Sequence, residues 1–465
     1  MIKPILNLAN AFRKRLGMDR AIAYTFAARV CMILGSTGTV LLIVRFLSKI
    51  EQGYYYTLLS LVNLQIIFEM GFSFVILQLA AHEAAHLRFG IDGCVEGEPH
   101  RHARLVAILR KTTHWYSVAG AIMLVALLPA GILFFRRTTP HDTEWFWPWT
   151  IAALATVVLF MLNPLCSFIE GCGQIRQVAG MRLAQAALAV AASWSALLLG
   201  KGLYAPGLAV AGNVFAVVFF LWRRRKILFG LLRADYDAEV LNWRAEVWSF
   251  QWKMAVTWLC SYFTVQVLTP VLFASRGPVE AGRMGMSLSI SAYTWNLVFA
   301  WMSTKAAPFG QLIAKKDYAA LDQLFFHTLW VSLGVLGAIV TTCMAGLLAL
   351  QRLFPTLASR MVSPQLFVLL LITAVSVLIV QSEAIYLRAH KEEPLIWQAI
   401  AIAVLTSAGA YLVAPRWGVT GTCIVYFVCS GILAVVSATL IFRTKRRARS
   451  ASSCPVASLP VEVAS

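Results

Sequence analysis

Long apolar stretches recur along the whole chain and are separated by short polar connections. A helix needs roughly 20 apolar residues to cross a hydrocarbon core about 30 Å thick. Twelve stretches meet this requirement: 21–47, 57–80, 113–135, 149–169, 178–199, 203–222, 250–274, 284–304, 324–350, 365–387, 395–414 and 418–442. The pattern predicts an all-α membrane protein with about twelve transmembrane helices.

Basic residues gather in every second connection. Of the 40 Lys and Arg residues, 27 fall in the termini and the loops on the same side, and 9 fall in the six alternate loops. Cytoplasmic loops of membrane proteins carry such an excess, so we expect both termini in the cytoplasm. The net charge of +19 follows largely from this bias. It suits an anionic lipid surface, and we expect no nucleic-acid partner.

Composition and loop length restrict the function further. A chain with 59% apolar and 13% charged residues would be insoluble as a monomeric globule of this length. The alternate loops are too short to fold into an extracytoplasmic domain. The nine cysteines all lie in predicted spans or in predicted cytoplasmic segments, so we expect no structural disulfide.

Two similar turns suggest an internal repeat. Glu51-Gln52-Gly53 follows the first span and Glu280-Ala281-Gly282 follows the seventh. Six spans separate them, so both halves have the same orientation, which predicts two pseudo-symmetric six-helix lobes. The expected organisation is an N-terminal lobe at 1–222, a cytoplasmic linker at 223–249, a C-terminal lobe at 250–442 and a basic, disordered cytoplasmic tail at 443–465.

The first two spans also carry a family resemblance. A turn with Glu51, Gly53 and Tyr55 precedes the segment 68–72, which reads Phe-Glu-Met-Gly-Phe. In these motifs the chain resembles the oligosaccharide flippase (polysaccharide transporter) branch of the multidrug/oligosaccharidyl-lipid/polysaccharide (MOP) exporter superfamily. The resemblance implies a V-shaped, MATE-like pair of bundles that flips a polyprenyl-diphosphate-linked oligosaccharide across the bacterial inner membrane by alternating access, for cell-surface or exopolysaccharide synthesis.

The resemblance also implies partners. These are the lipid-linked oligosaccharide, membrane lipids, a coupling ion (H⁺ or Na⁺), and a polysaccharide polymerase and glycosyltransferases of the same pathway. The His-rich stretch from His82 to His102 departs from the family pattern. No cofactor is implied.

Few charged side chains lie inside the predicted spans. A charge near the bilayer centre costs about 2.5–3.5 kcal/mol, so each one is a functional candidate. The six are Arg29, Arg45, Arg182, Lys253, Glu69 and Glu383. We interpret Arg45 and Glu383, which lie nearer the span ends, as interface residues.

Cations and hydroxyls share narrow faces of the first and seventh spans. Helical spacing aligns Arg29 with Ser36, and Lys253 with Thr257 and Thr264. One interpretation is a central cavity that captures a diphosphate. The alternative is that the cations reach the headgroups and the hydroxyls bond their own helix carbonyls. The substrate-binding residues predicted by the first interpretation are Arg29, Lys253, Arg182, Ser36, Thr257 and Thr264.

Glu69 lies near the middle of the second span. A protonatable carboxyl at this depth would couple proton or sodium binding to transport. Alternatively, it is the structural counter-ion of Arg29 on the adjacent helix.

The segment from His82 to His86 reads His-Glu-Ala-Ala-His, the H-E-x-x-H pattern of helical zinc sites. Its only nearby third ligand, Asp92, follows Gly90 in a loop-like stretch. We therefore expect a helix end at headgroup level and no metal site. The chain carries no catalytic motif, which predicts a transporter rather than an enzyme.

Two other functions are alternatives for a polytopic chain of this kind. A multidrug-type small-molecule or cation antiporter would favour carboxylates over cations in its cavity. A polytopic polysaccharide polymerase or ligase would need a sizeable outer loop, which the predicted topology does not provide.

Overall fold

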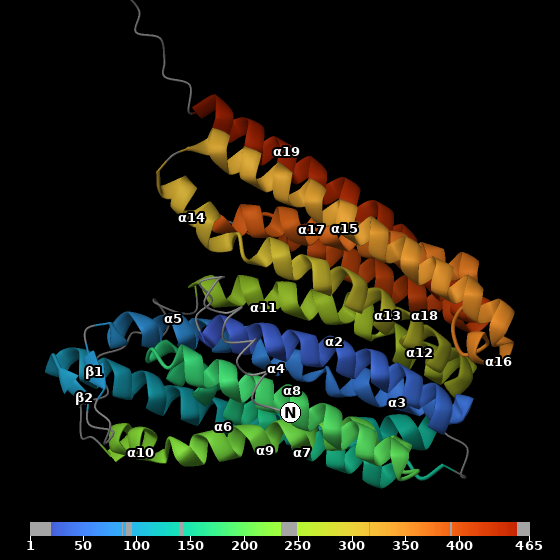
Figure 1. Ribbon diagram of the computed structural model, residues 1–465, viewed down its shortest axis with the longest axis horizontal. Coiled ribbons are helices and arrows are strands. Elements are labelled where there is room, and N and C mark those ends of the chain that lie inside the picture. Colours follow the sequence, from blue (N-terminus) through green and yellow to red (C-terminus); the bar gives the residue numbers. More distant parts are fainter. Residues whose placement is uncertain are drawn as a thin grey trace, which may run out of the picture. The chain divides into compact units, whose positions relative to one another are not determined.

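A computed structural model describes residues 20–85, 87–89, 95–138, 143–233, 249–315, 317–390 and 393–452. This part of the chain is almost entirely α-helical (Figure 1). Contacts divide the chain into two compact units, Met1–Met286 and Ser287–Ser465.

The first unit contains most of the helices. Their bounds are α2 (Arg20–Phe46), α3 (Lys49–Val62), α4 (Gln65–Glu69), α5 (Phe72–Ala84), α6 (Pro99–Thr138), α7 (Phe146–Gly171), α8 (Ile175–Leu198), η1 (Gly202–Tyr204), α9 (Ala205–Arg223), α10 (Arg225–Arg233), α11 (Ser249–Ser261), η4 (Tyr262–Gln266) and α12 (Leu268–Arg276). Between α5 and α6, strands β1 (Leu87–Phe89) and β2 (Val95–Gly97) pair antiparallel, with Leu87 opposite Gly97. Helix α13 (Pro278–Ser303) crosses the boundary between the units.

The second unit contains the remaining helices. They are α14 (Ala306–Ala314), α15 (Tyr318–Leu353), α16 (Pro355–Ala358), α17 (Pro364–Ala389), α18 (Ile396–Tyr426), η5 (Phe427–Leu433) and α19 (Ala434–Ser452). Aromatic side chains of four helices form its core: Phe325 packs against Tyr386, with ring centroids 5.1 Å apart, and against Phe442 at 5.3 Å. Phe309 joins this cluster.

All twelve predicted spans fall on helical segments. In the described residues, nine helices are long and apolar enough to cross a membrane, or ten if the bent pair formed by 49–69 and 72–84 is one span. One of the nine, Ile396–Ala448, covers two predicted spans and is interrupted by non-helical Gly418. Helix α13 is not among them, because serines, a threonine and an asparagine lower its hydropathy. The chain is therefore an all-α, multi-pass membrane protein.

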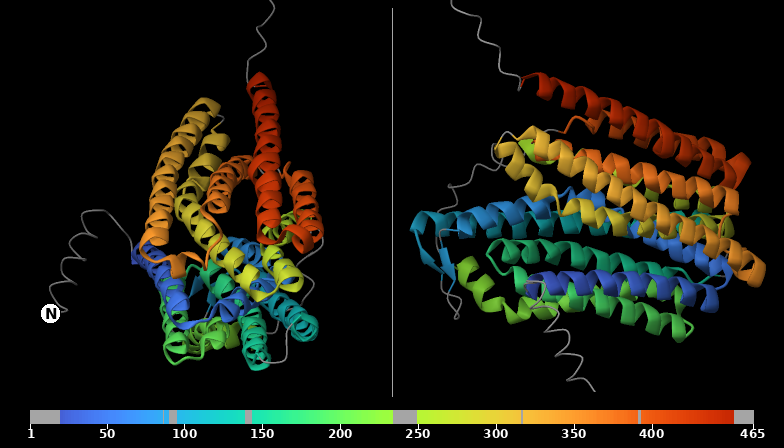
Figure 2. Two further views of the ribbon diagram at one scale, coloured as in Figure 1. Left: turned by 90° about the vertical axis from the view of Figure 1, so that its right-hand side faces the viewer. Right: turned by 45° about the horizontal axis from the view of Figure 1, so that its top comes forward.

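Close helix contacts in the first unit depend on small residues. Helices α6 to α9 run alongside one another (Figure 2), and α2 packs against α8. A Cβ at Gly212 of α9 would lie 2.8 Å from the Leu188 carbonyl oxygen of α8, and one at Gly171 would lie 2.6 Å from that of Leu77. Such small residues let helix backbones approach in a membrane, where packing replaces the hydrophobic effect between helices.

The two turns predicted as repeat partners touch each other. Glu51 completes a capping box with Ser48 at the start of α3: the Ser48 amide donates to Glu51 Oε2 at 2.8 Å. One residue on, Gln52 Nε2 donates to the Gly282 carbonyl at 3.0 Å. A Cβ at Gly53 would come within 1.9 Å of the Pro278 carbonyl oxygen. These contacts place α12 and the start of α13 in the first unit, whereas the division at the 223–249 linker stays a prediction.

The predicted disordered tail begins as a helix. Helix α19 continues through the basic residues to Ser452, and within it Arg446 is held by α15. Its Nε donates to Asp322 Oδ2 at 2.7 Å, and its guanidinium lies 4.8 Å from the centre of the Phe326 ring. The rest of the tail, 453–465, and most of the predicted linker, 234–248, lie outside the described residues.

Candidate functional site

The second predicted span is broken near its middle. Helix α4 ends at Glu69 and α5 begins at Phe72, and the helical segments on either side differ in direction by 44°. Met70 and Gly71 both adopt left-handed backbone conformations, with φ of 47° and 72°. Non-helical backbone at membrane depth is tolerated only where it is buried in protein or lines a water-filled cavity. The break therefore marks a candidate site.

The Glu69 carboxylate accepts hydrogen bonds across this break. Its Oε1 accepts a hydrogen bond from the Ser73 backbone amide, and its Oε2 accepts one from the Tyr116 hydroxyl, each at 3.3 Å. Tyr116 is a buried residue of α6 whose ring packs on Phe160 of α7. An acidic group at the first turn of α5 also interacts favourably with the helix dipole. The break in the helix thus provides both the amide and the dipole that hold the carboxylate.

Glu69 has neutral hydrogen-bond donors but no cationic partner in the part of the chain that the structure describes. No ion pair links it to Arg29, which is exposed on α2. The counter-ion interpretation of Glu69 is therefore not supported. A half-buried carboxylate held by an amide and a phenol can take up a proton or a monovalent cation, and discontinuous membrane helices commonly form such sites.

Arg29, Ser36 and Thr39 form a polar stripe on α2 that is only partly available to a ligand. The Ser36 hydroxyl donates to the Ile33 carbonyl at 2.9 Å. Thr39 donates to the Gly35 carbonyl at 2.8 Å and accepts a bond from Trp194 Nε1 of α8 at 2.9 Å. Thr39 thus serves the packing of α2 on α8. Arg29 remains exposed, with its charge unpaired in the described chain.

The stripe of the seventh span, formed by Lys253 and Thr257 of α11 and Thr264 of η4, has the same character. The Thr257 hydroxyl donates to the Lys253 carbonyl at 3.1 Å, and Thr264 donates to the Cys260 carbonyl at 2.8 Å. Lys253 is exposed, with Nζ 5.9 Å from the centre of the Trp252 ring. On both helices the hydroxyl protons are used by the helix's own backbone, so the donors for an anion must come from the cations. Helix α11 packs against α4, which places this stripe on a neighbour of the broken span.

Arg182, the third predicted cation, is already neutralised. Its Nη2 lies 2.6 Å from Glu170 Oε2, and its Nη1 donates to Glu170 Oε1 at 3.3 Å. This forked geometry is the strong form of an arginine–carboxylate pair. The contact joins the end of α7 to α8, which weakens the case for Arg182 as a ligand for an anionic substrate.

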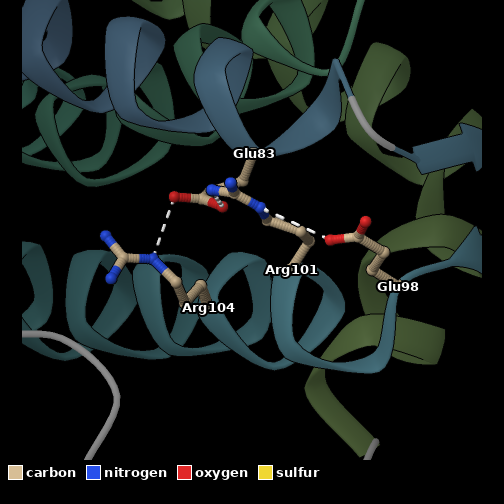
Figure 3. A network of polar contacts seen from close by, with 4 residues as sticks. All are labelled: Glu83, Glu98, Arg101 and Arg104. Atoms are coloured by element: carbon tan, nitrogen blue, oxygen red, sulfur yellow. Dashed lines mark hydrogen bonds and ion pairs between the residues drawn. The ribbon is translucent and has the colours of Figure 1, made fainter.

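A second ionic group lies at the end of α5 and was missed by sequence reasoning (Figure 3). Glu83, the acidic residue of the H-E-x-x-H pattern, is buried between two arginines of α6. Its Oε2 accepts from Arg101 Nη1 at 3.0 Å, and its Oε1 accepts from Arg104 Nε at 2.9 Å. Both carboxylate oxygens are therefore occupied. The available signal was the spacing of the two arginines, which places them on one face of a helix.

The other residues of the H-E-x-x-H pattern are only partly described. His86 and Asp92 lie outside the described residues. Within the described ranges, no group of three His, Cys, Asp or Glu side chains is arranged to hold a metal ion. The absence of a metal site stays a prediction, and it now has a physical reason, since a carboxylate held by two guanidinium groups cannot serve as the base of a zinc site.

We expect Glu83→Gln to lower the stability of the protein by about 2 kcal/mol. Removing the carboxylate takes away the buried acceptor that both guanidinium groups share, and their partial exposure keeps the cost below that of a fully buried pair. Glu98→Gln is the matched control: that side chain is 69% exposed, against 2% for Glu83, and lies 3.8 Å from Arg101. Its loss should cost less than about 0.5 kcal/mol. Thermal unfolding in detergent measures both, and equal shifts would contradict the network's role.

Glu383 in the second unit was wrongly interpreted as an interface residue. It is 3% exposed, and its Oε1 accepts a hydrogen bond from Thr439 of α19 at 2.9 Å. Its Oε2 has no hydrogen-bond partner among the residues described. The sequence around it gave no indication of which helix would cover it.

Solved structures share this fold over nearly the whole chain. An inward-facing multidrug resistance MATE family transporter of the MOP superfamily matches with a TM-score of 0.61 at 12% identity, covering 89% of this chain and 99% of its own. The outward-facing conformation of such a transporter matches at 0.57 and 12%, covering 93% and 97%. A MOP superfamily transporter from Pyrococcus furiosus, whose binding pocket is described as having reverse polarity, matches at 0.56 and 12%, covering 93% and 97%.

At the level of sequence alone, the chain matches no protein-family model and no curated protein. At such low identity, the structural likeness establishes the fold and nothing finer. The predicted fold class, about twelve transmembrane helices in two six-helix lobes, is confirmed. The chain has the fold of the MATE transporters of the MOP superfamily.

Proposed function

We propose that the protein flips a lipid-linked oligosaccharide, with a polyprenyl-diphosphate carrier, across the bacterial inner membrane by alternating access. The observation that carries this proposal is the sign of the exposed charges on α2 and α11. Arg29 and Lys253 are both exposed and have no ion-pair partner in the described parts of the chain. A cation on a membrane-spanning helix requires water or an anion, and a diphosphate is an anion that guanidinium and ammonium groups bind strongly.

The membrane potential favours the proposed direction. An inside-negative potential assists outward movement of an anionic headgroup by about 2.3 kcal/mol per charge per 100 mV. The basic excess on one side of the predicted topology predicts both termini in the cytoplasm, which is consistent with an inner-membrane location. The enzymes that make and polymerise the glycan, glycosyltransferases and a polymerase, are then the functional partners.

Glu69 is the proposed site for a coupling ion. Its carboxylate lies at the helix break, where protonation or Na⁺ binding would replace the bonds from Ser73 and Tyr116 and so alter the bend. We expect Glu69→Gln to reach normal abundance but to make transport independent of an imposed proton or sodium gradient. Tyr116→Phe, which removes one donor and leaves the carboxyl, should retain the dependence. A Glu69→Gln protein with wild-type gradient dependence would remove this role.

A multidrug-type antiporter is the second candidate. It is favoured by two observations: the matched MATE transporters are multidrug resistance proteins, and a carboxylate at the helix break suits an organic cation. The transporter from Pyrococcus furiosus is described as having a pocket of reverse polarity that suggests a different function. Pocket polarity therefore varies within this fold, and the cations of α2 and α11 favour the anionic substrate here.

Deletion of the gene in its host separates the two candidates. If the protein is a flippase, the surface polymer is lost, the lipid-linked precursor accumulates at the inner leaflet, and susceptibility to cationic drugs is unchanged. If it is a drug antiporter, the polymer is normal and susceptibility to cationic drugs rises. Restoring the gene on a plasmid must reverse whichever change is seen.

A further inference from the structure

A hollow of about 400 Å³ lies where α8 begins and α9 ends. It is lined by Gln177, in the first turn of α8, and by Phe220, Arg223 and Arg224, in the last turn and cap of α9. The lining thus contains two guanidinium groups and no carboxylate. The positive-inside pattern of the sequence predicts that this end of both helices lies at the cytoplasmic surface.

Both arginines of the hollow lack a counter-charge. Neither Arg223 nor Arg224 forms an ion pair within the described ranges. Arg223 lies over the Phe219 ring at 5.1 Å, and Arg224 is half-buried as the cap of α9. Two adjacent like charges beside low-dielectric protein repel each other, and an anion between them would offset that repulsion. The hollow therefore favours an anionic ligand.

The start of α8 adds a second, independent attraction for an anion. Its N-cap residue, Gln174, makes no capping hydrogen bond through its side chain. The amides of the first turn are therefore not satisfied by a side-chain cap. A helix N-terminus of this kind binds phosphate through its backbone amides and its dipole. Gln177 of the same turn lines the hollow together with the two arginines, so the start of α8 lies at this hollow.

An apolar surface borders the hollow. Phe215, Phe219 and Trp222 of α9 are exposed, and Arg225 stacks over Trp222 at 4.9 Å. Helix α10, which follows, is amphipathic: it buries Leu228 and Leu231 and packs against α6 and α9, while its Phe229 is exposed. Exposed aromatic rings beside basic residues are typical of helices at the membrane interface. A ligand with an anionic head and an apolar tail fits this combination better than a free anion.

We propose that this hollow binds the phosphate headgroup of an anionic membrane lipid, held by Arg223, Arg224 and the first turn of α8, with the acyl chains along the aromatic residues of α9. The site does not depend on which substrate the protein transports. It would fix the cytoplasmic ends of α8 and α9 to the anionic leaflet.

Native mass spectrometry of the purified full-length protein, titrated with phosphatidylglycerol or phosphatidylcholine, tests the proposal. We expect one phosphatidylglycerol to bind about tenfold more tightly than phosphatidylcholine, because one additional charge-assisted contact raises affinity by about that factor. The double variant R223Q/R224Q should lose this preference. R136Q/R137Q should retain it. This control alters two consecutive exposed arginines, at the end of α6. R224K, which keeps the charge but not the forked donors, should lie between them.

Three outcomes would overturn the proposal. The first is an unchanged preference for phosphatidylglycerol in R223Q/R224Q. The second is an equal loss in both double variants, which would mean general charge attraction. The third is displacement of the lipid by inorganic phosphate at millimolar concentration, which would show that the site takes a free anion. If R223Q/R224Q does not fold, the intermediate affinity of R224K still decides between a specific site and none.

Discussion

Gly53→Ala is expected to destabilise the protein by about 1–3 kcal/mol and to lower its abundance in the membrane. The new Cβ would lie 1.9 Å from the Pro278 carbonyl oxygen and 2.5 Å from the carbonyl carbon. Both atoms are backbone, so α13 must move away. That movement would also break the bond from Gln52 Nε2 to the Gly282 carbonyl. Thermal unfolding of the purified variant measures the loss.

Gly334→Ala provides the matched control for this prediction. Gly334 lies within α15, and a Cβ added there meets no atom within 4 Å. The same change should leave stability unchanged or raise it by up to about 1 kcal/mol, because alanine favours a helix. If Gly53→Ala were as stable as Gly334→Ala, the close contact between the two turns would be wrong.

Charge reversal at the two exposed cations should abolish function. We expect Arg29→Glu and Lys253→Glu each to reduce surface polymer about a hundredfold, because the variant carboxylate repels the diphosphate that the wild-type cation attracts. Arg29→Ala, which only removes the contact, should cost about tenfold, and Arg29→Lys less than that. Polymer production is measured in the deletion strain, with the membrane abundance of each variant determined in parallel.

Arg45→Glu is the control for charge reversal on the same helix. Arg45 is exposed in the last turn of α2, at the end that the predicted topology assigns to the outside. It should support normal polymer production. Normal polymer from both Arg29→Glu and Lys253→Glu at wild-type abundance would instead favour the interpretation in which these cations only reach lipid headgroups.

The spanning helices could be predicted because length and apolarity decide them. A run of about 20 apolar residues has few alternatives to a membrane helix, and every predicted span lies on helix. The break at Met70 and Gly71 could not be placed in the same way. The apolar pattern continues on both sides of it, and hydropathy carries no information on backbone φ. Gly71 was a local signal, since glycine readily adopts positive φ, but a glycine alone does not show that a helix is broken there.

The side-chain partners at the candidate sites were less predictable. Glu83 was recognised as part of a zinc-like pattern, but its partners Arg101 and Arg104 lie 18 and 21 residues away, and the intervening hairpin brings them alongside. Spacing predicted that each stripe follows one face of a helix, but in the seventh span Lys253 and Thr257 belong to α11 whereas Thr264 belongs to η4. Spacing could not decide whether Ser36 and Thr257 face a ligand or bond their own backbone, because both states share the same periodicity.

Translocation by the purified protein in proteoliposomes tests the central claim most directly. A fluorescent lipid-linked oligosaccharide is placed in both leaflets, and a membrane-impermeant enzyme that cleaves the outer pool reports movement of the inner pool. The proposal predicts that wild-type protein makes the whole pool accessible, that Arg29→Glu leaves half of it protected, and that an organic cation is not transported. Protection of half the pool by wild-type protein, together with gradient-driven transport of an organic cation, would contradict the proposed flippase function and support the antiporter function instead.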